Sequence, residues 1–412
     1  MLKRKNSMAE KIKKMDASSM NLVNKKIILN LIKQKGLLSR SDIGKITGLT
    51  PPSLKRIIDE LMEKDNLIEY TGVDSSSGGR PSLLVRFKNN SNFIIGIDLG
   101  ATYIRGCLVD LNAQFISEVE VPTEIEKGFE SIITKVANIV IKLSHRKPTI
   151  GKIWGVGIGV AGLVINKSEI IESSPDFNWT QINLRKELNK KIELPFFYDN
   201  STRLMALSEL SFNNSKIFSN FAVINVGYGI ASGLVIDGKL VYGHSGFAGE
   251  TGHISVDHYS SVKCKCGMYG CLEALASGHR IVSLAKKDLG NSDAAILRKL
   301  CKNNPKEITA QIVAMAAKQG DVLSNKIYND ITEYLCVGIA TIANLLSPEI
   351  IYIGGGISLN GDFFFELINK KIANYLIAPN SKLKIVPSTF GEQATSIGAV
   401  SLVLKKVMDL EL

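Results

Sequence analysis

The feature that most restricts this sequence is a cluster of one histidine and three cysteines: His253, Cys264, Cys266 and Cys271. Their spacing lets one loop wrap around one ion, and an imidazole with three thiolates completes a closed tetrahedral zinc site. Three unpaired buried thiols are the alternative. Outside the oxidising compartments, a tight cluster of cysteines indicates metal binding more readily than a disulfide. We therefore predict a structural zinc ion held by these four residues.

Two glutamates, Glu250 and Glu273, flank the cluster. Carboxylates in these positions can accept hydrogen bonds from the hydroxyl groups of a sugar. They can equally support the metal ligands from outside the coordination shell. The residues alone leave both roles open.

Positive charge is concentrated in the first fifth of the chain. Residues 1–88 hold 18 Lys and Arg against 9 Asp and Glu, so they carry +9 of the total net charge of +11. This excess indicates one basic module beside a nearly neutral body. No apolar run reaches the roughly 18 residues that a membrane span needs, and no apolar segment follows the basic residues 3–5. We therefore expect a cytoplasmic protein without a membrane partner.

Residues 18–88 show the pattern of three helices followed by a hairpin. One apolar stripe covers the first helix, with Leu22, Val23, Ile27, Ile28, Leu31 and Ile32. Ser39 and Asp42 resemble a capping box that starts a second helix, and Thr50 is the expected N-cap of a third helix with Pro51 at its first position. Alternating runs on either side of the polar segment 74–81 predict a hairpin. We predict a winged helix-turn-helix domain over 18–88, preceded by a basic, flexible arm over 1–17.

The third helix has one polar face. Its apolar side holds Leu54, Ile57, Ile58, Leu61 and Met62, and its other side presents Pro52, Ser53, Lys55 and Arg56. Arg80 lies at the tip of the expected wing. Because a recognition helix enters the major groove and a wing reaches phosphate or the minor groove, we predict that these five polar-face and wing residues contact a double-stranded DNA operator. A small helical interaction domain is the alternative, and the basic excess argues against it.

Glycine-punctuated strands dominate residues 92–412. A unit of strand, glycine turn and strand occurs near 93–109 and again near 221–236, which predicts two similar α/β halves facing a cleft. Such turns can hold phosphate through backbone N–H groups, although a tight hairpin has the same pattern. The Gly157-x-Gly159-x-x-Gly162 run matches a dinucleotide fingerprint only weakly, because no βαβ unit with a following acidic residue accompanies it. We predict a strand over 153–159 that ends in a glycine-rich loop reaching Gly162, and we interpret the run as a lining of the cleft.

Over residues 18–405 the sequence resembles the ROK family of repressors and sugar kinases. The resemblance is carried by segments 77–81, 98–102, 249–253 and 353–356, and by the cysteine cluster with Glu273. The N-terminal module resembles the repressor branch of the family. The resemblance implies an α/β body of two lobes with an actin-like ATPase fold, assembled as a homodimer or homotetramer.

The resemblance also implies a sugar site, whose residues fall on Asn200, Glu250, His253 and Glu273. The two ring nitrogens of His253 are distinct, so one can bind zinc while the other meets the sugar. Residues 92–412 are thus expected to form a sugar-kinase-like sensor domain. We expect a transcriptional repressor whose effector, xylose or a hexose, releases it from DNA.

Departures from the family pattern argue against catalysis. Ser201 stands where the family's kinases have the catalytic Asp, and a serine hydroxyl cannot act as the general base. Tyr228 and Ala231 alter the second phosphate turn and crowd a triphosphate, and Asp176 replaces a family Asn. We therefore expect no kinase activity. An active sugar kinase is the alternative that these residues disfavour, whereas nothing in the sequence excludes a repressor controlled by a partner protein.

Overall fold

A computed structural model describes residues 17–74, 82–165, 169–213 and 218–408. The chain forms two compact units that divide after Ser91, and the larger comprises Asn92–Val407. No helix in the described ranges is long and apolar enough to cross a membrane.

The first unit is a winged helix-turn-helix domain, as predicted. Its elements are α1 (Ala17–Lys35), β1 (Leu38–Ser39), α2 (Arg40–Thr47), α3 (Pro51–Asp59), β2 (Ile68–Asp74) and β3 (Ser82–Phe87). The strands form a sheet in the order β1-β3-β2. The Ser39 hydroxyl accepts the backbone N–H of Asp42, so the predicted cap of α2 is confirmed. One π-helical turn, η1 (Glu60–Lys64), continues α3.

Thr50 occupies the N-cap position of α3 and Pro51 the first helical position, as predicted, although the Thr50 hydroxyl donates to the Ser53 hydroxyl and makes no capping hydrogen bond to the helix. The prediction for α1 was wrong. Helix α1 buries Ile28 and Ile32, whereas Leu22, Val23 and Ile27 are exposed. The six apolar residues therefore do not form one buried stripe, because they spread over more of the helix surface than the small domain covers.

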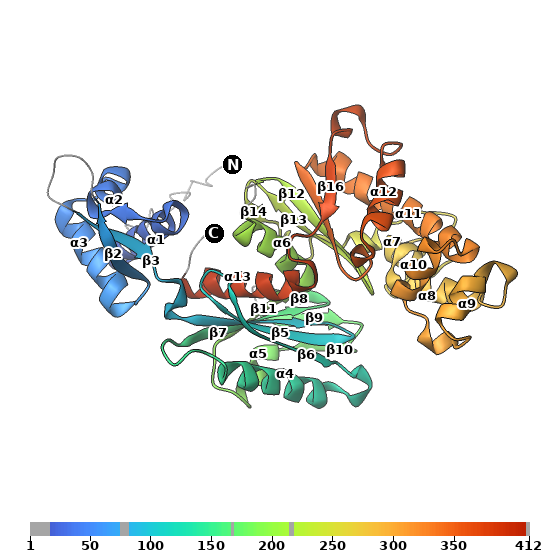
Figure 1. Cartoon of the computed structure of the whole chain (residues 1–412), viewed down its shortest axis with the longest axis horizontal. Coiled ribbons are helices and arrows are strands. Elements are labelled where there is room, and N and C mark those ends of the chain that lie inside the picture. The colour runs from blue at the N-terminus through green and yellow to red at the C-terminus, as the bar shows by residue number, and fades with distance from the viewer. Residues whose placement is uncertain (1–16, 75–81, 166–168, 214–217, 409–412) are drawn as a thin grey trace, which may run out of the picture. The chain divides into compact units, whose positions relative to one another are not determined.

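The first lobe of the larger unit is a five-stranded sheet in the order β11-β7-β4-β5-β6. Its strands are β4 (Phe93–Leu99), β5 (Tyr103–Asp110), β6 (Phe115–Pro122), β7 (Ile153–Val160) and β11 (Phe196–Asn200). Helices α4 (Phe129–Ser144) and α13 (Ala394–Met408) cover opposite faces of the sheet (Figure 1). A small sheet of β8 (Leu163–Ile165), β9 (Ile170–Ser174) and β10 (Trp179–Ile182), and the short helix α5 (Leu184–Asn189), complete the lobe.

Glycines in the first lobe let α13 approach the sheet closely. A Cβ on Gly96 would lie 2.1 Å from the Ser396 carbonyl oxygen, and one on Gly157 would lie 2.0 Å from that of Ala399. A Cβ on Gly159 would lie 2.2 Å from the side-chain methyl carbon of Thr395. The predicted strand over 153–159 is confirmed, because Gly157 and Gly159 lie inside β7. Only Gly162, with φ +137°, lies in the turn that follows.

The second lobe has a sheet in the order β14-β13-β12-β15-β16. Its strands are β12 (Phe221–Val226), β13 (Ile230–Ile236), β14 (Lys239–Leu240), β15 (Ile350–Gly354) and β16 (Lys384–Pro387). Its helices are α7 (Leu272–Ala276), α8 (Gly278–Lys287), α9 (Ala295–Leu300), α10 (Ala310–Lys318), α11 (Val322–Leu346) and α12 (Asp362–Ile372). Helix α6 (Ser201–Phe212) leads from the last strand of the first lobe into this lobe.

The two lobes repeat one strand arrangement. In the first, β4 pairs antiparallel with β5 and parallel with β7. In the second, β12 pairs antiparallel with β13 and parallel with β15. The predicted pair of similar α/β halves is confirmed, because both start from the same hairpin of two buried strands joined by a glycine-containing turn.

Candidate functional site

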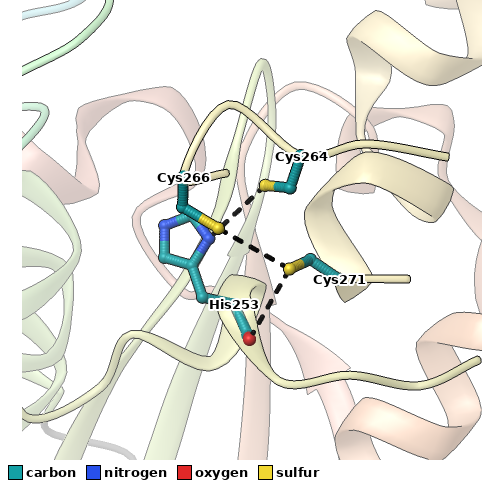
Figure 2. Close-up of side chains that lie close together, drawn as sticks. All are labelled: His253, Cys264, Cys266 and Cys271. Atoms are coloured by element: carbon teal, nitrogen blue, oxygen red, sulfur yellow. Dashed lines mark hydrogen bonds between the residues drawn. The ribbon is translucent and has the colours of Figure 1, made fainter. Parts of the chain in front are cut away.

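The four predicted metal ligands come together in one place (Figure 2). Their ligand atoms all lie within 4.8 Å of one another. Cys266 Sγ is 3.7 Å from Cys271 Sγ, and Cys264 Sγ is 3.7 Å from His253 Nδ1. A tetrahedral zinc ion with Zn–S bonds of about 2.3 Å separates its sulfur ligands by about 3.8 Å. The donor set and its spacing therefore fit zinc.

The loop that carries the cysteines is shaped by short backbone contacts. The Cys264 N–H donates to the Met268 carbonyl, and bridges join Ser255 to Cys271 and Lys263 to Tyr269. Gly270, with φ +67°, is required here because a Cβ would lie 1.9 Å from the Asp257 carbonyl oxygen. These contacts fold the chain back on itself around the four ligands.

Burial disfavours ionisation of two of the three cysteine thiols. Cys264 and Cys271 are buried, and burial raises the pKa of both thiols, that of Cys271 to about 12. A metal ion supplies the charge that stabilises the thiolates, so metal binding releases protons.

Glu250 and Glu273 both adjoin the metal loop. Glu250 precedes the short 3₁₀ helix η4 (Thr251–His253), and Gly252 in this helix packs so closely that a Cβ would lie 2.0 Å from the Ile230 carbonyl oxygen and 3.3 Å from the Glu273 Cβ. Burial raises the pKa of Glu250, the Arg203 guanidinium lowers it and the Glu273 carboxylate raises it. The two carboxylates and His253 therefore belong to one electrostatic neighbourhood.

Glu273 already has a structural partner. Its carboxylate accepts the Ile230 N–H at 2.9 Å, beside the altered glycine turn between β12 and β13. A Cβ on Gly229 would lie 2.5 Å from the Glu273 carboxylate oxygen. Glu273 thus fixes this turn as well as flanking the metal loop.

Asn200 is engaged at the start of α6. Its side-chain oxygen accepts the N–H groups of Thr202 and Arg203, and its amide donates to the Gly162 carbonyl. Ser201 begins the helix and is buried. The proposed role of Asn200 in sugar binding stays a prediction, since the helix cap uses most of its hydrogen-bonding capacity.

Arg203 was not among the site residues predicted from the sequence. Its guanidinium, 2% exposed, pairs with Asp199 Oδ1 at 2.6 Å. It also donates to the carbonyls of Val164, in the first lobe, and Gly246, in the segment of the second lobe that leads to Glu250. The Tyr242 hydroxyl donates to the other Asp199 oxygen. An acidic and a basic residue spaced i, i+4 at a helix start was the available signal.

The recognition helix of the first unit presents Pro52, Lys55 and Arg56 to solvent and half-buries Ser53. Arg56 pairs with Glu60 at 2.9 Å, and Glu60 also pairs with Lys25 of α1. Arg80 lies outside the described residues.

Comparison with known proteins gives two matches within the chain. Residues 94–406 match the ROK family, and residues 24–65 match the winged helix-turn-helix DNA-binding family. A xylose repressor from Caldicellulosiruptor bescii is 31% identical over 390 residues, which cover 94% of this chain and 96% of the relative.

Solved structures resemble the chain to different extents. A ROK family transcriptional regulator, described as a homolog of the E. coli MLC protein, aligns over 95% of this chain and 99% of its own, with 28% identity and a TM-score of 0.79. A ROK family glucokinase from Streptomyces griseus, solved with glucose and AMPPNP, aligns over 76% of this chain and 99% of its own, with 28% identity and a TM-score of 0.69.

Proposed function

The chain belongs to the ROK family, and we propose that it is a transcriptional repressor whose operator binding is controlled by a sugar held in the larger unit. The observation that carries this proposal is the union of a winged helix-turn-helix domain and a ROK body in one chain. A xylose repressor shares this organisation over 94% of the chain. The effector is xylose or a hexose, bound at Glu250, His253 and Glu273 with Asn200, and its binding releases DNA.

The DNA interface of this repressor consists of Pro52, Ser53, Lys55 and Arg56 on α3, with Arg80 from the wing. Acidic Glu60 and Glu63 follow on the same helix, which favours contact through its N-terminal turns. Repressors of this kind bind two operator half-sites as dimers, so we propose a homodimer or homotetramer.

Arg56→Ala is expected to weaken operator binding without unfolding the protein. If Arg56 reaches a base edge, the loss is about 1–3 kcal/mol, and if it reaches only phosphate, the salt slope of binding falls by about 1. Lys318→Ala, an exposed lysine of the larger unit, is the matched control and keeps wild-type affinity. Gel-shift titration at two salt concentrations measures both. Wild-type affinity and salt slope in Arg56→Ala contradict the interface.

Glu250→Ala is expected to bind the operator normally and to lose its response to sugar. A half-buried carboxylate that accepts sugar hydroxyls contributes roughly 1–3 kcal/mol to effector binding. In cells the variant behaves as a super-repressor. Operator affinity with and without D-xylose and D-glucose, measured together with zinc content, tests this. Glu366→Ala, an exposed glutamate on α12, is the control.

The two roles of Glu250 give different results in this experiment. If Glu250 only supports the metal loop, Glu250→Ala loses zinc and stability and binds DNA weakly. Full sugar-dependent release by Glu250→Ala removes this residue from the effector site. A wild-type repressor that responds to no sugar contradicts the proposed effector itself.

Kinase activity is expected to be absent, although ROK glucokinases are comparably similar in sequence. The Ser201 hydroxyl cannot act as the general base that takes a proton from a sugar hydroxyl. Asp199 cannot replace it, because its oxygens are taken by Arg203, the Asn200 N–H and Tyr242. An ADP-release assay with free pentoses, hexoses and amino sugars checks this, and turnover near 1 per second, the low end of ordinary enzyme rates, refutes it.

A further inference from the structure

One lysine of the metal loop contacts both lobes of the larger unit. Lys265 lies between the ligands Cys264 and Cys266. Its Nζ is 3.1 Å from Asp176 Oδ1 and 4.6 Å from the centre of the Tyr228 ring. Asp176 belongs to the turn between β9 and β10 in the first lobe, whereas Tyr228 belongs to the glycine turn between β12 and β13 in the second. A single ammonium group therefore joins segments of both lobes.

Both ends of this contact are held in place by their surroundings. On one side, Lys265 lies in a loop that is held by the hydrogen bond from the Cys264 N–H to the Met268 carbonyl and by the bridge between Lys263 and Tyr269. On the other side, Asp176 sits in a tight turn in which the Phe177 N–H donates to the Ser174 carbonyl. Phe177 itself is buried and stacks on Trp179 with ring centres 4.8 Å apart. The pair forms with little loss of backbone freedom.

Its exposure distinguishes this contact from the Arg203–Asp199 pair, whose guanidinium also contacts both lobes. The side chains of Lys265 and Asp176 are 49% and 21% exposed, while those of Arg203 and Asp199 are 2% and 0% exposed. A buried pair is costly to break, whereas a partly solvated pair exchanges readily with water or with another polar partner. The Arg203 pair is thus costly to break, whereas a polar ligand can compete for the Lys265 contact.

We propose that the Asp176–Lys265 pair is a latch between the lobes that the effector must displace, so that Lys265 sets the effector concentration to which the repressor responds. The inference rests on the proposed function. An uncharged, hydroxyl-rich ligand donates hydrogen bonds to the Asp176 carboxylate and competes there with the ammonium group. The metal loop holds Lys265 in the position from which it opposes this ligand.

The first test is calorimetric titration of the DNA-free, zinc-loaded protein with D-xylose and, separately, D-glucose. Lys265→Met is expected to bind the sugar about two- to fivefold more tightly than the wild type, the range that a partly exposed ion pair can supply. Raising the salt concentration to about 0.5 M screens the pair. It is expected to bring the wild-type affinity toward that of Lys265→Met and to leave the variant unchanged.

The exposed Lys263, one residue before Cys264, supplies the matched control. Lys263→Met removes the same charge from the same loop and is expected to keep both the wild-type affinity and its salt response. Unchanged or weaker sugar binding by Lys265→Met overturns the latch. Tighter binding by Lys263→Met to the same degree also overturns it, because the effect is then one of net charge.

A second test needs no sugar. Asp176→Asn and Lys265→Met are compared alone and together by denaturant unfolding of the zinc-loaded protein. A latch makes the two effects non-additive, with about two- to fivefold coupling in the unfolding constant, and additive effects overturn it. If neither sugar binds the wild type, the proposed effectors fail and the unfolding cycle still decides whether the latch exists.

Discussion

Cys266→Ser is expected to release the metal ion from the larger unit and to lower its thermal stability. Metal analysis of the wild type, purified without chelator, is expected to give about one zinc ion per chain, since four protein ligands close the coordination shell. Changing a group outside the shell already costs 10–100-fold in metal affinity. Loss of a ligand is therefore expected to cost at least about 2.8 kcal/mol of binding free energy.

Cys266 is the most informative of the four ligands to replace. Its side chain is exposed, so serine disturbs little packing. Met268→Ala, two residues away and 65% exposed, is the matched control and is expected to keep both zinc and melting temperature. Unchanged metal content and melting temperature in Cys266→Ser contradict the site. Because protons compete with the metal for the thiolates, zinc retention is also expected to weaken as the pH falls.

Arg203→Met is expected to destabilise the protein by about 3–5 kcal/mol, because it leaves the Asp199 carboxylate buried without its partner. Methionine nearly fills the space of the arginine, so the loss is electrostatic and not one of volume. Arg105→Met, which removes a partly exposed arginine that pairs with Glu120 and Glu392, is the control and is expected to cost less than about 1 kcal/mol. Denaturant unfolding measures both.

The double variant Asp199→Asn/Arg203→Met sharpens this prediction. Removing the stranded charge is expected to recover part of the stability that Arg203→Met loses. A loss below about 1 kcal/mol in the single variant, or no recovery in the double one, means that the pair and its two carbonyl contacts do not hold the lobes as described.

Secondary structure was predictable from the sequence wherever a pattern of neighbouring residues determines it. Two repeated units of strand, glycine turn and strand predicted the hairpins of both sheets. The spacing of His253 and the cysteines predicted the metal cluster. Each of these features depends on residues that are close in the sequence, so the hydrophobic period and the residue spacing are enough to predict it. The cap of α2 by Ser39 was predictable for the same reason.

Contacts between distant segments were not predictable in this way. The close approach of α13 to Gly157 and Gly159 could not be predicted from the glycine pattern, because α13 lies more than 230 positions further on. The partner of Lys265 could not be predicted from its position between two cysteines, because only the fold places Asp176 beside it. The exposure of Leu22, Val23 and Ile27 was not predictable for a related reason. Apolar character alone does not tell which face of a helix is buried by the rest of the domain.

The close packing of α13 on β4 and β7 has a consequence for how the chain is made. The first-lobe sheet is complete in sequence by Asn200, but the helix that covers one of its faces begins only at Ala394. At about 5–20 residues per second, synthesis takes roughly 10–40 s to pass from one to the other. During that interval the glycines of β4 and β7 lack the helix that packs on them. The first lobe can therefore complete its core only after α13 has been synthesised, although its strands β4 and β7 are made long before.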